Sequence, residues 1–180
     1  MLKYALPFTL LPLLASCAAP SVPPPATLPA PPAAPRVTSA PAAVLDRYAG
    51  DWSVDDLTPG EWRISRSDSG SRVTFTDGRS AVQAIIACGN GALSLSRSGA
   101  VPADAAVMMR VRTSFAQRAL SVRVDRDARL IHTSLDKRDP LWDQIAYSRG
   151  RFLIETSFQP PLIVPVRPEI SRVIEDCRAR

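Results

Sequence analysis

Residues 81–96 read AVQAIIACGNGALSLS, two strand-like segments on either side of Gly89-Asn90-Gly91. In the second segment, apolar and polar residues alternate, and this period of two indicates a half-buried strand. The Asn-Gly pair supplies the positive φ angles that a tight two-residue hairpin turn requires. We therefore expect a β-hairpin with strands over 81–88 and 92–96.

Similar patterns extend the sheet in both directions along the chain. Alternation over 61–66 and 72–76, around turn residues at 68–71, predicts another hairpin. Further strands are expected over 106–114, 119–125, 129–134 and 151–156. Prolines 160, 161, 165 and 168 should interrupt regular pairing after that point.

Two helices are predicted in the last third of the chain. Asp139-Pro140 places a capping residue before a proline at the first helical position, and a short apolar face follows before Gly150. The second helix begins near Pro168, and the residues on its apolar face recur with a helical period: Ile170, Val173, Ile174 and Cys177. The pattern predicts an α+β fold of mainly antiparallel sheet, or a partly open barrel, with a short internal helix and a C-terminal helix.

The first sixteen residues have the layout of a secretory signal peptide. Lys3 precedes an apolar stretch over 4–14, which ends in Ala15-Ser16. That stretch is shorter than the about 20 apolar residues that a membrane-spanning helix needs. We expect residues 1–16 to be removed during export.

Leu14-Ala15-Ser16-Cys17 resembles the lipobox of bacterial lipoproteins. The resemblance implies that the Cys17 thiol receives a diacylglycerol and becomes the mature N-terminus. It also implies sorting to the outer membrane. In that family an aspartate directly after the cysteine usually retains the protein in the inner membrane, and this chain has Ala18 at that position. The alternative is an ordinary signal peptide with a chance cysteine, which would still export the chain.

Residues 17–43 are expected to form a lipidated tether. From residue 18 onward this tract is almost entirely Pro, Ala, Ser, Thr and Val, a composition that cannot bury enough apolar surface to fold. Proline favours an extended backbone of about 3.1 Å per residue, so the tract could reach roughly 80 Å. Residues 44–180 then form one globular domain, which the leader would place in the periplasm.

The chain is basic, with a formal net charge of +5, and nearly all of its cations are arginines. Export argues against nucleic acid as a partner. After Cys17, the chain contains two more cysteines, Cys88 and Cys177. An even pair in an oxidising compartment predicts a disulfide, here one that joins the C-terminal helix to the sheet.

Few residues point to catalysis. His132 is the single histidine, so a histidine-based metal site is not expected, and a lone histidine on a strand is usually a surface residue. No nucleophile motif is found in the domain. The carboxylate pairs Asp55-Asp56 and Asp125-x-Asp127 leave a carboxylate hydrolase open as an alternative, although acidic pairs are common in turns.

Arginines form the most suggestive group. Arg110 and Arg112 would share one face of a strand, Arg123 would lie on the neighbouring strand, and Arg149 and Arg151 flank Gly150. Together they could form a basic stripe that contacts phosphate or carboxylate groups. The alternative is a solvated sheet face balanced by nearby aspartates.

Two wider resemblances follow from particular motifs. Gly50-Asp51-Trp52 is similar to the G-x-W motif of lipocalins and implies a carrier of a small hydrophobic ligand. Residues 139–152 (DPLWDQIAYSRGRF) and 168–178 (PEISRVIEDCR) resemble uncharacterised alphaproteobacterial lipoproteins, a likeness that implies no activity.

The sequence therefore predicts a non-enzymatic envelope protein, anchored by lipid to the outer membrane and facing the periplasm. Its expected partners are peptidoglycan, lipopolysaccharide or an envelope protein. No cofactor is implied.

Overall fold

The computed structural model describes residues 51–180, and these form two antiparallel sheets and two helices. This confirms the expected α+β class. In chain order the elements are β1 (Glu61–Ser67), β2 (Gly70–Thr76), β3 (Val82–Gly89), β4 (Ala92–Ser98), β5 (Met108–Arg112), β6 (Gln117–Ser121), β7 (Arg123–Asp125), β8 (Leu130–Asp136), α1 (Pro140–Ala146), β9 (Arg151–Thr156), β10 (Leu162–Pro165) and α2 (Pro168–Arg178).

Both expected hairpins are confirmed. β1 pairs with β2, and β3 pairs with β4 through a turn in which Asn90 and Gly91 have φ angles of 51° and 73°. These are the left-handed conformations that the Asn-Gly pair was expected to supply.

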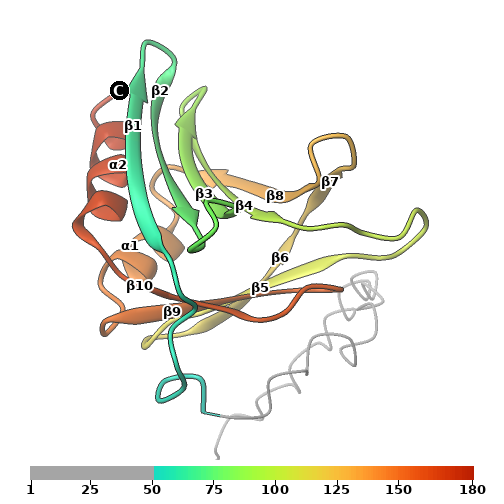
Figure 1. Cartoon of the computed structure of the whole chain (residues 1–180). Coiled ribbons are helices and arrows are strands. Elements are labelled where there is room, and N and C mark those ends of the chain that lie inside the picture. Colours follow the sequence, from blue (N-terminus) through green and yellow to red (C-terminus); the bar gives the residue numbers. More distant parts are fainter. Residues whose placement is uncertain (1–50) are drawn as a thin grey trace, which may run out of the picture. The chain divides into compact units, whose positions relative to one another are not determined.

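The strands belong to two sheets, neither of which closes on itself. The larger sheet has the order β1-β2-β3-β4-β8-β7, and the smaller one has the order β10-β9-β5-β6. In Figure 1 the larger sheet is strongly curved, and the smaller one runs beneath it while both helices lie on one side. The described strands are therefore open sheets, and no barrel is formed.

The single strand expected over 119–125 is wrong. β6 ends at Ser121, which pairs with Met108 in the smaller sheet, whereas Arg123 begins β7 and pairs with His132 in the larger sheet. The chain thus passes from one sheet to the other at Val122. Such transfers make the corners of packed sheets, and they leave the local alternation of side chains almost unchanged.

The prolines after residue 160 do not prevent pairing, contrary to expectation. β10 pairs with β9, with Pro165 opposite Arg151 at the end of the strand. A proline is tolerated here because β10 is an edge strand, where a missing N–H need not break the sheet. The Pro165 carbonyl also accepts a hydrogen bond from Trp62 Nε1 at 2.8 Å.

The two helices begin and pack as predicted. Asp139 caps α1 by accepting a hydrogen bond from the Leu141 N–H at 2.9 Å, and Pro140 occupies the first helical position. The α1 helix ends at Ala146, before Gly150. The buried face of α2 is the expected set: Ile170, Val173, Ile174 and Cys177.

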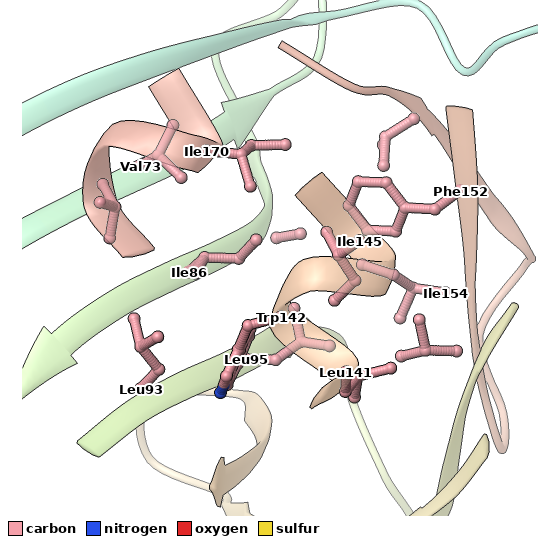
Figure 2. Packing of buried hydrophobic residues seen from close by; sticks show 14 of the residues in the cluster. Val73, Ile86, Leu93, Leu95, Leu141, Trp142, Ile145, Phe152, Ile154 and Ile170 are labelled. Atoms are coloured by element: carbon pink, nitrogen blue, oxygen red, sulfur yellow. The ribbon is translucent and has the colours of Figure 1, made fainter. Parts of the chain in front are cut away.

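One continuous hydrophobic core lies between the sheets and the helices. Figure 2 shows Trp142 and Ile145 of α1 among side chains from both sheets, including Leu95 of β4 and Ile154 of β9. Trp142 is fully buried and Trp62 nearly so.

The predicted disulfide is confirmed. Cys88 near the end of β3 and Cys177 in α2 are bonded, with their Cα atoms 5.4 Å apart. The bond fixes the C-terminal helix to the larger sheet.

The remaining expectations concern the first part of the chain. The leader (1–16), Cys17, the tether (17–43) and the expected start of the domain at residue 44 lie outside the described residues. Within residues 51–180, neither helix has the length and apolar character needed to cross a membrane.

We predict that replacing both Cys88 and Cys177 by alanine lowers the free energy of unfolding by up to about 4 to 5 kcal/mol, because the bond closes a long loop in the unfolded chain. The two cysteines are 89 residues apart. Urea unfolding of both proteins measures the difference. A free-thiol assay on the denatured, unreduced wild type should find none from this pair, and two reactive thiols would contradict the bond.

The cap of α1 predicts a loss of stability in acid. Desolvation raises the pKa of Asp139, but hydrogen bonds from Arg118 and the Leu141 N–H outweigh it, and the net pKa lies below its ordinary value. A carboxylate with a lowered folded-state pKa stabilises the fold above its unfolded pKa of about 3.9, and that contribution is lost as the pH falls through the folded pKa.

Asp139→Asn should therefore cost stability at pH 7, and the cost should shrink as the pH falls below about 4. Urea unfolding across this range is the measurement. Asp127→Asn, which changes an exposed carboxylate in the β7–β8 turn, is the matched control. A cost for Asp139→Asn that stays constant with pH would contradict the assignment.

Candidate functional site

Arg110 and Arg112 lie side by side on β5, as predicted, but they are engaged by a carboxylate that the sequence did not indicate. Arg110 binds Glu155 of β9 through two contacts, Nε to Oε2 at 2.7 Å and Nη2 to Oε1 at 3.2 Å. Arg112 Nε lies 2.9 Å from the same Oε2, as an ion pair without hydrogen-bond alignment. The three side chains are only 16%, 15% and 5% exposed.

The other predicted arginines are divided between the two sheets. Arg123 is exposed on β7 in the other sheet, so its expected place beside Arg110 and Arg112 is wrong, and the cause is the change of sheet at Val122. Arg151 donates a hydrogen bond to the backbone carbonyl of Asp55, and Arg149 is exposed in the turn before β9. The expected stripe is therefore interrupted at Arg123, which belongs to the other sheet, whereas Arg151 lies on β9, the strand next to β5.

In the second carboxylate pair, Asp125 is engaged within its own turn. Asp125 accepts a hydrogen bond from the Ala128 N–H at 2.9 Å, which is ordinary turn chemistry. No group of three or more His, Cys, Asp or Glu side chains suited to a metal ion occurs in the part of the chain that the structure describes.

His132 lies on the outward face of the larger sheet. Its backbone register places it between Ser96 of β4 and Arg123 of β7, and it is partly exposed. Within residues 51–180 it forms no ion pair with a carboxylate. A catalytic histidine is usually oriented by such a partner, so the position fits a surface residue.

The unexpected feature of the domain is Arg97 of β4. Alternation places it on the same face as Leu93 and Leu95, toward the core, and it is only 4% exposed. Charged side chains are almost never buried this deeply unless they are paired.

Arg97 is held by oxygen atoms that carry no net charge. Its Nη1 donates to the Gln83 carbonyl at 2.8 Å, to Gln83 Oε1 at 3.0 Å and to the Ser98 carbonyl at 3.0 Å. Its Nε is enclosed and has no hydrogen-bond partner, and no carboxylate among residues 51–180 forms an ion pair with it. Burial lowers the pKa of Arg97 to about 10, so the guanidinium is still charged at neutral pH.

Arg97 lines a hollow of about 380 Å³ beside the edge of the smaller sheet. The walls come from five segments: the chain before β1 (Thr58, Pro59), the β2–β3 turn (Asp77, Gly78, Arg79), β3 (Gln83), β4 (Arg97) and the start of β10 with the residues before it (Pro160, Pro161, Leu162). This hollow brings together one buried cation and an apolar rim.

Asp77 also lines this hollow, and its carboxylate already accepts hydrogen bonds from neighbouring residues. Its Oδ1 accepts hydrogen bonds from the N–H groups of Ala81 and Arg79, both at 2.9 Å, and these bonds lower its pKa. Its Oδ2 accepts from Gln83 Nε2 at 3.0 Å. The Gln83 amide thus connects Asp77 to Arg97 without the two charges meeting.

One sequence signal could have identified Arg97. The alternation Leu93-Ser94-Leu95-Ser96 assigns the next residue to the inward face, but the predicted strand ended at Ser96. A strand extended by two residues, as β4 is, would have placed a charge on a core-facing position.

No family model, curated protein or solved structure matches this chain.

We predict that Glu155→Gln lowers the free energy of unfolding by about 3 kcal/mol or more, because it leaves two largely buried cations without their shared carboxylate. Glu61→Gln is the matched control: its ion pair with Arg63 is exposed, and the loss should be below about 0.5 kcal/mol. Urea unfolding measures both. Equal losses would show that the pairing with Glu155 contributes no more than a surface pair.

Proposed function

We propose that this protein is a lipid-anchored, non-enzymatic binding module of the bacterial cell envelope. The observation that carries the proposal is the Cys88–Cys177 disulfide. Structural disulfides persist in oxidising compartments such as the periplasm and are rare in the cytosol. The bond therefore agrees with the export that the first sixteen residues predict.

The anchor follows from the lipobox-like segment that ends in Cys17. Each buried methylene of an acyl chain contributes roughly 0.8 kcal/mol, so two or three chains hold a protein firmly on a bilayer. Ala18 favours the outer membrane, with the domain on its periplasmic side. The proline-rich tract over 18–43 would hold the domain away from the lipid surface.

Binding is favoured over catalysis by the way the polar groups are used. Arg110, Arg112 and Glu155 engage one another, and Asp77 accepts hydrogen bonds from its own turn. The one buried cation that lacks a carboxylate, within the described residues, is Arg97 beside its hollow. A preformed charge beside an open hollow suits recognition of an anionic group.

The two alternative functions gain no specific support. A lipocalin-like carrier holds its ligand inside a barrel, and the sheets described for residues 51–180 are open. A carboxylate hydrolase needs two carboxylates that face one substrate bond, whereas Asp125 ends β7 and Asp127 lies in the exposed turn after it. Peptidoglycan, lipopolysaccharide and envelope proteins are the partner classes that fit the proposed address.

We predict that Cys17→Ser moves the protein from the membrane to the soluble fraction of cells, because serine cannot accept the thioether-linked lipid. Immunoblotting of membrane and soluble fractions is the measurement. The variant with both Cys88 and Cys177 replaced by alanine is the matched control and should stay in the membrane fraction. A Cys17→Ser protein that remains in membranes would overturn the anchor.

A further inference from the structure

The two ends of the Arg97 guanidinium are used differently. Nη1 is saturated by three oxygen atoms of Gln83 and Ser98. Nε has no partner, and no hydrogen bond from Nη2 is formed with any residue of the described range. Nε is enclosed by protein atoms, whereas Nη2 is accessible, so Nη2 is the nitrogen that can donate a charge-assisted hydrogen bond to a ligand.

The electrostatics of the hollow favour an anion. Taking a cation out of water is costly unless an opposite charge compensates it, and the neutral oxygens around Nη1 supply only dipoles. Asp77 cannot turn toward Arg97 without giving up the N–H groups of Arg79 and Ala81. A bound anion would supply the missing charge, and Arg79 on the wall adds a second positive group.

The apolar walls of the hollow limit which kind of molecule can bear the anionic group. Pro59, Pro160, Pro161 and Leu162 present apolar surface. A small apolar group fits such walls, whereas a fully hydrated ion would lose water without gaining contacts. The volume of about 380 Å³ suits a small molecule or the end of a chain.

We propose that Arg97 and this hollow form a binding site for a carboxylate borne on a small apolar body. The inference rests on the proposed binding role and gives it a ligand class, but it does not depend on the lipid anchor. Two sources share this chemistry: a free short-chain acid and the terminal carboxylate of a peptide. Arg97 Nη2 binds the carboxylate, and the proline walls contact the apolar part.

Nuclear magnetic resonance of the full chain labelled with ¹⁵N tests the site, because the Arg97 Nε–H group gives its own signal. Propionate represents the free acid, N-acetylalanine represents a peptide terminus, and sodium chloride keeps the ionic strength constant. We expect saturable shifts of this signal with one or both carboxylates. Propionamide, which has the same shape but no charge, should cause no shift, and inorganic phosphate should bind more weakly than the better carboxylate.

Three variants separate the site from general charge effects. Arg97→Gln should weaken carboxylate binding by about tenfold or more, since it removes the charge and the Nη2 donor. Arg123→Gln removes an exposed arginine of the same charge and should bind like the wild type. Pro160→Trp fills the rim while leaving Arg97 in place, so it should also weaken binding and remains informative if Arg97→Gln fails to fold.

No shift of the Arg97 Nε–H signal by either carboxylate would overturn the site. Equal responses to propionamide or to phosphate would overturn the assignment to carboxylates. Because the proposed anchor is read from cell fractions, neither result bears on it.

Discussion

The packing of α1 between two open sheets is the contact on which the rest of the domain depends. Neither sheet closes, so the apolar inner faces of both need a cover. Leu141, Trp142 and Ile145 supply it from a helix of only seven residues, which is shorter than the about 12 to 15 residues that an isolated helix needs to be stable in water. The helix and the sheets therefore stabilise one another (Figure 2).

Polar contacts fix where this helix lies. The Trp142 Nε1 donates to the Asp136 carbonyl at 3.0 Å, which ties the indole to the end of β8. Asp139 caps the first turn and is itself paired with Arg118 near β6. One short connection thus joins the larger sheet, the helix and the smaller sheet, and it gives the core its single arrangement.

Local chemistry made much of this fold predictable. Asn90-Gly91 determines a turn, Asp139-Pro140 begins a helix, and the spacing of Ile170, Val173, Ile174 and Cys177 defines a buried face; each signal depends on near neighbours in the chain.

The transfer at Val122 was missed because alternation is the same whichever sheet a strand joins. β10 was missed because a proline is acceptable only at an edge, and edges are set by strand order. For the same reason no pattern could show that Glu155 would meet Arg110 and Arg112. The site was predicted least well, because Arg97 lies on the core-facing side of a strand that was expected to end at Ser96.

The Cys88–Cys177 bond also determines how the domain would respond to mechanical force. A pull on the two ends of the chain could lengthen only the residues before Cys88 and the three after Cys177, because the covalent loop between them cannot be drawn out. The load would fall first on the contacts that hold the chain ahead of β1, including the hydrogen bond from the Thr58 N–H to the Ile163 carbonyl at 2.8 Å. Those contacts and the β1–β2 hairpin would extend while α1, α2 and the smaller sheet stayed enclosed by the loop. Under force, the part of the domain before Cys88 would extend, and the part inside the disulfide loop would extend little.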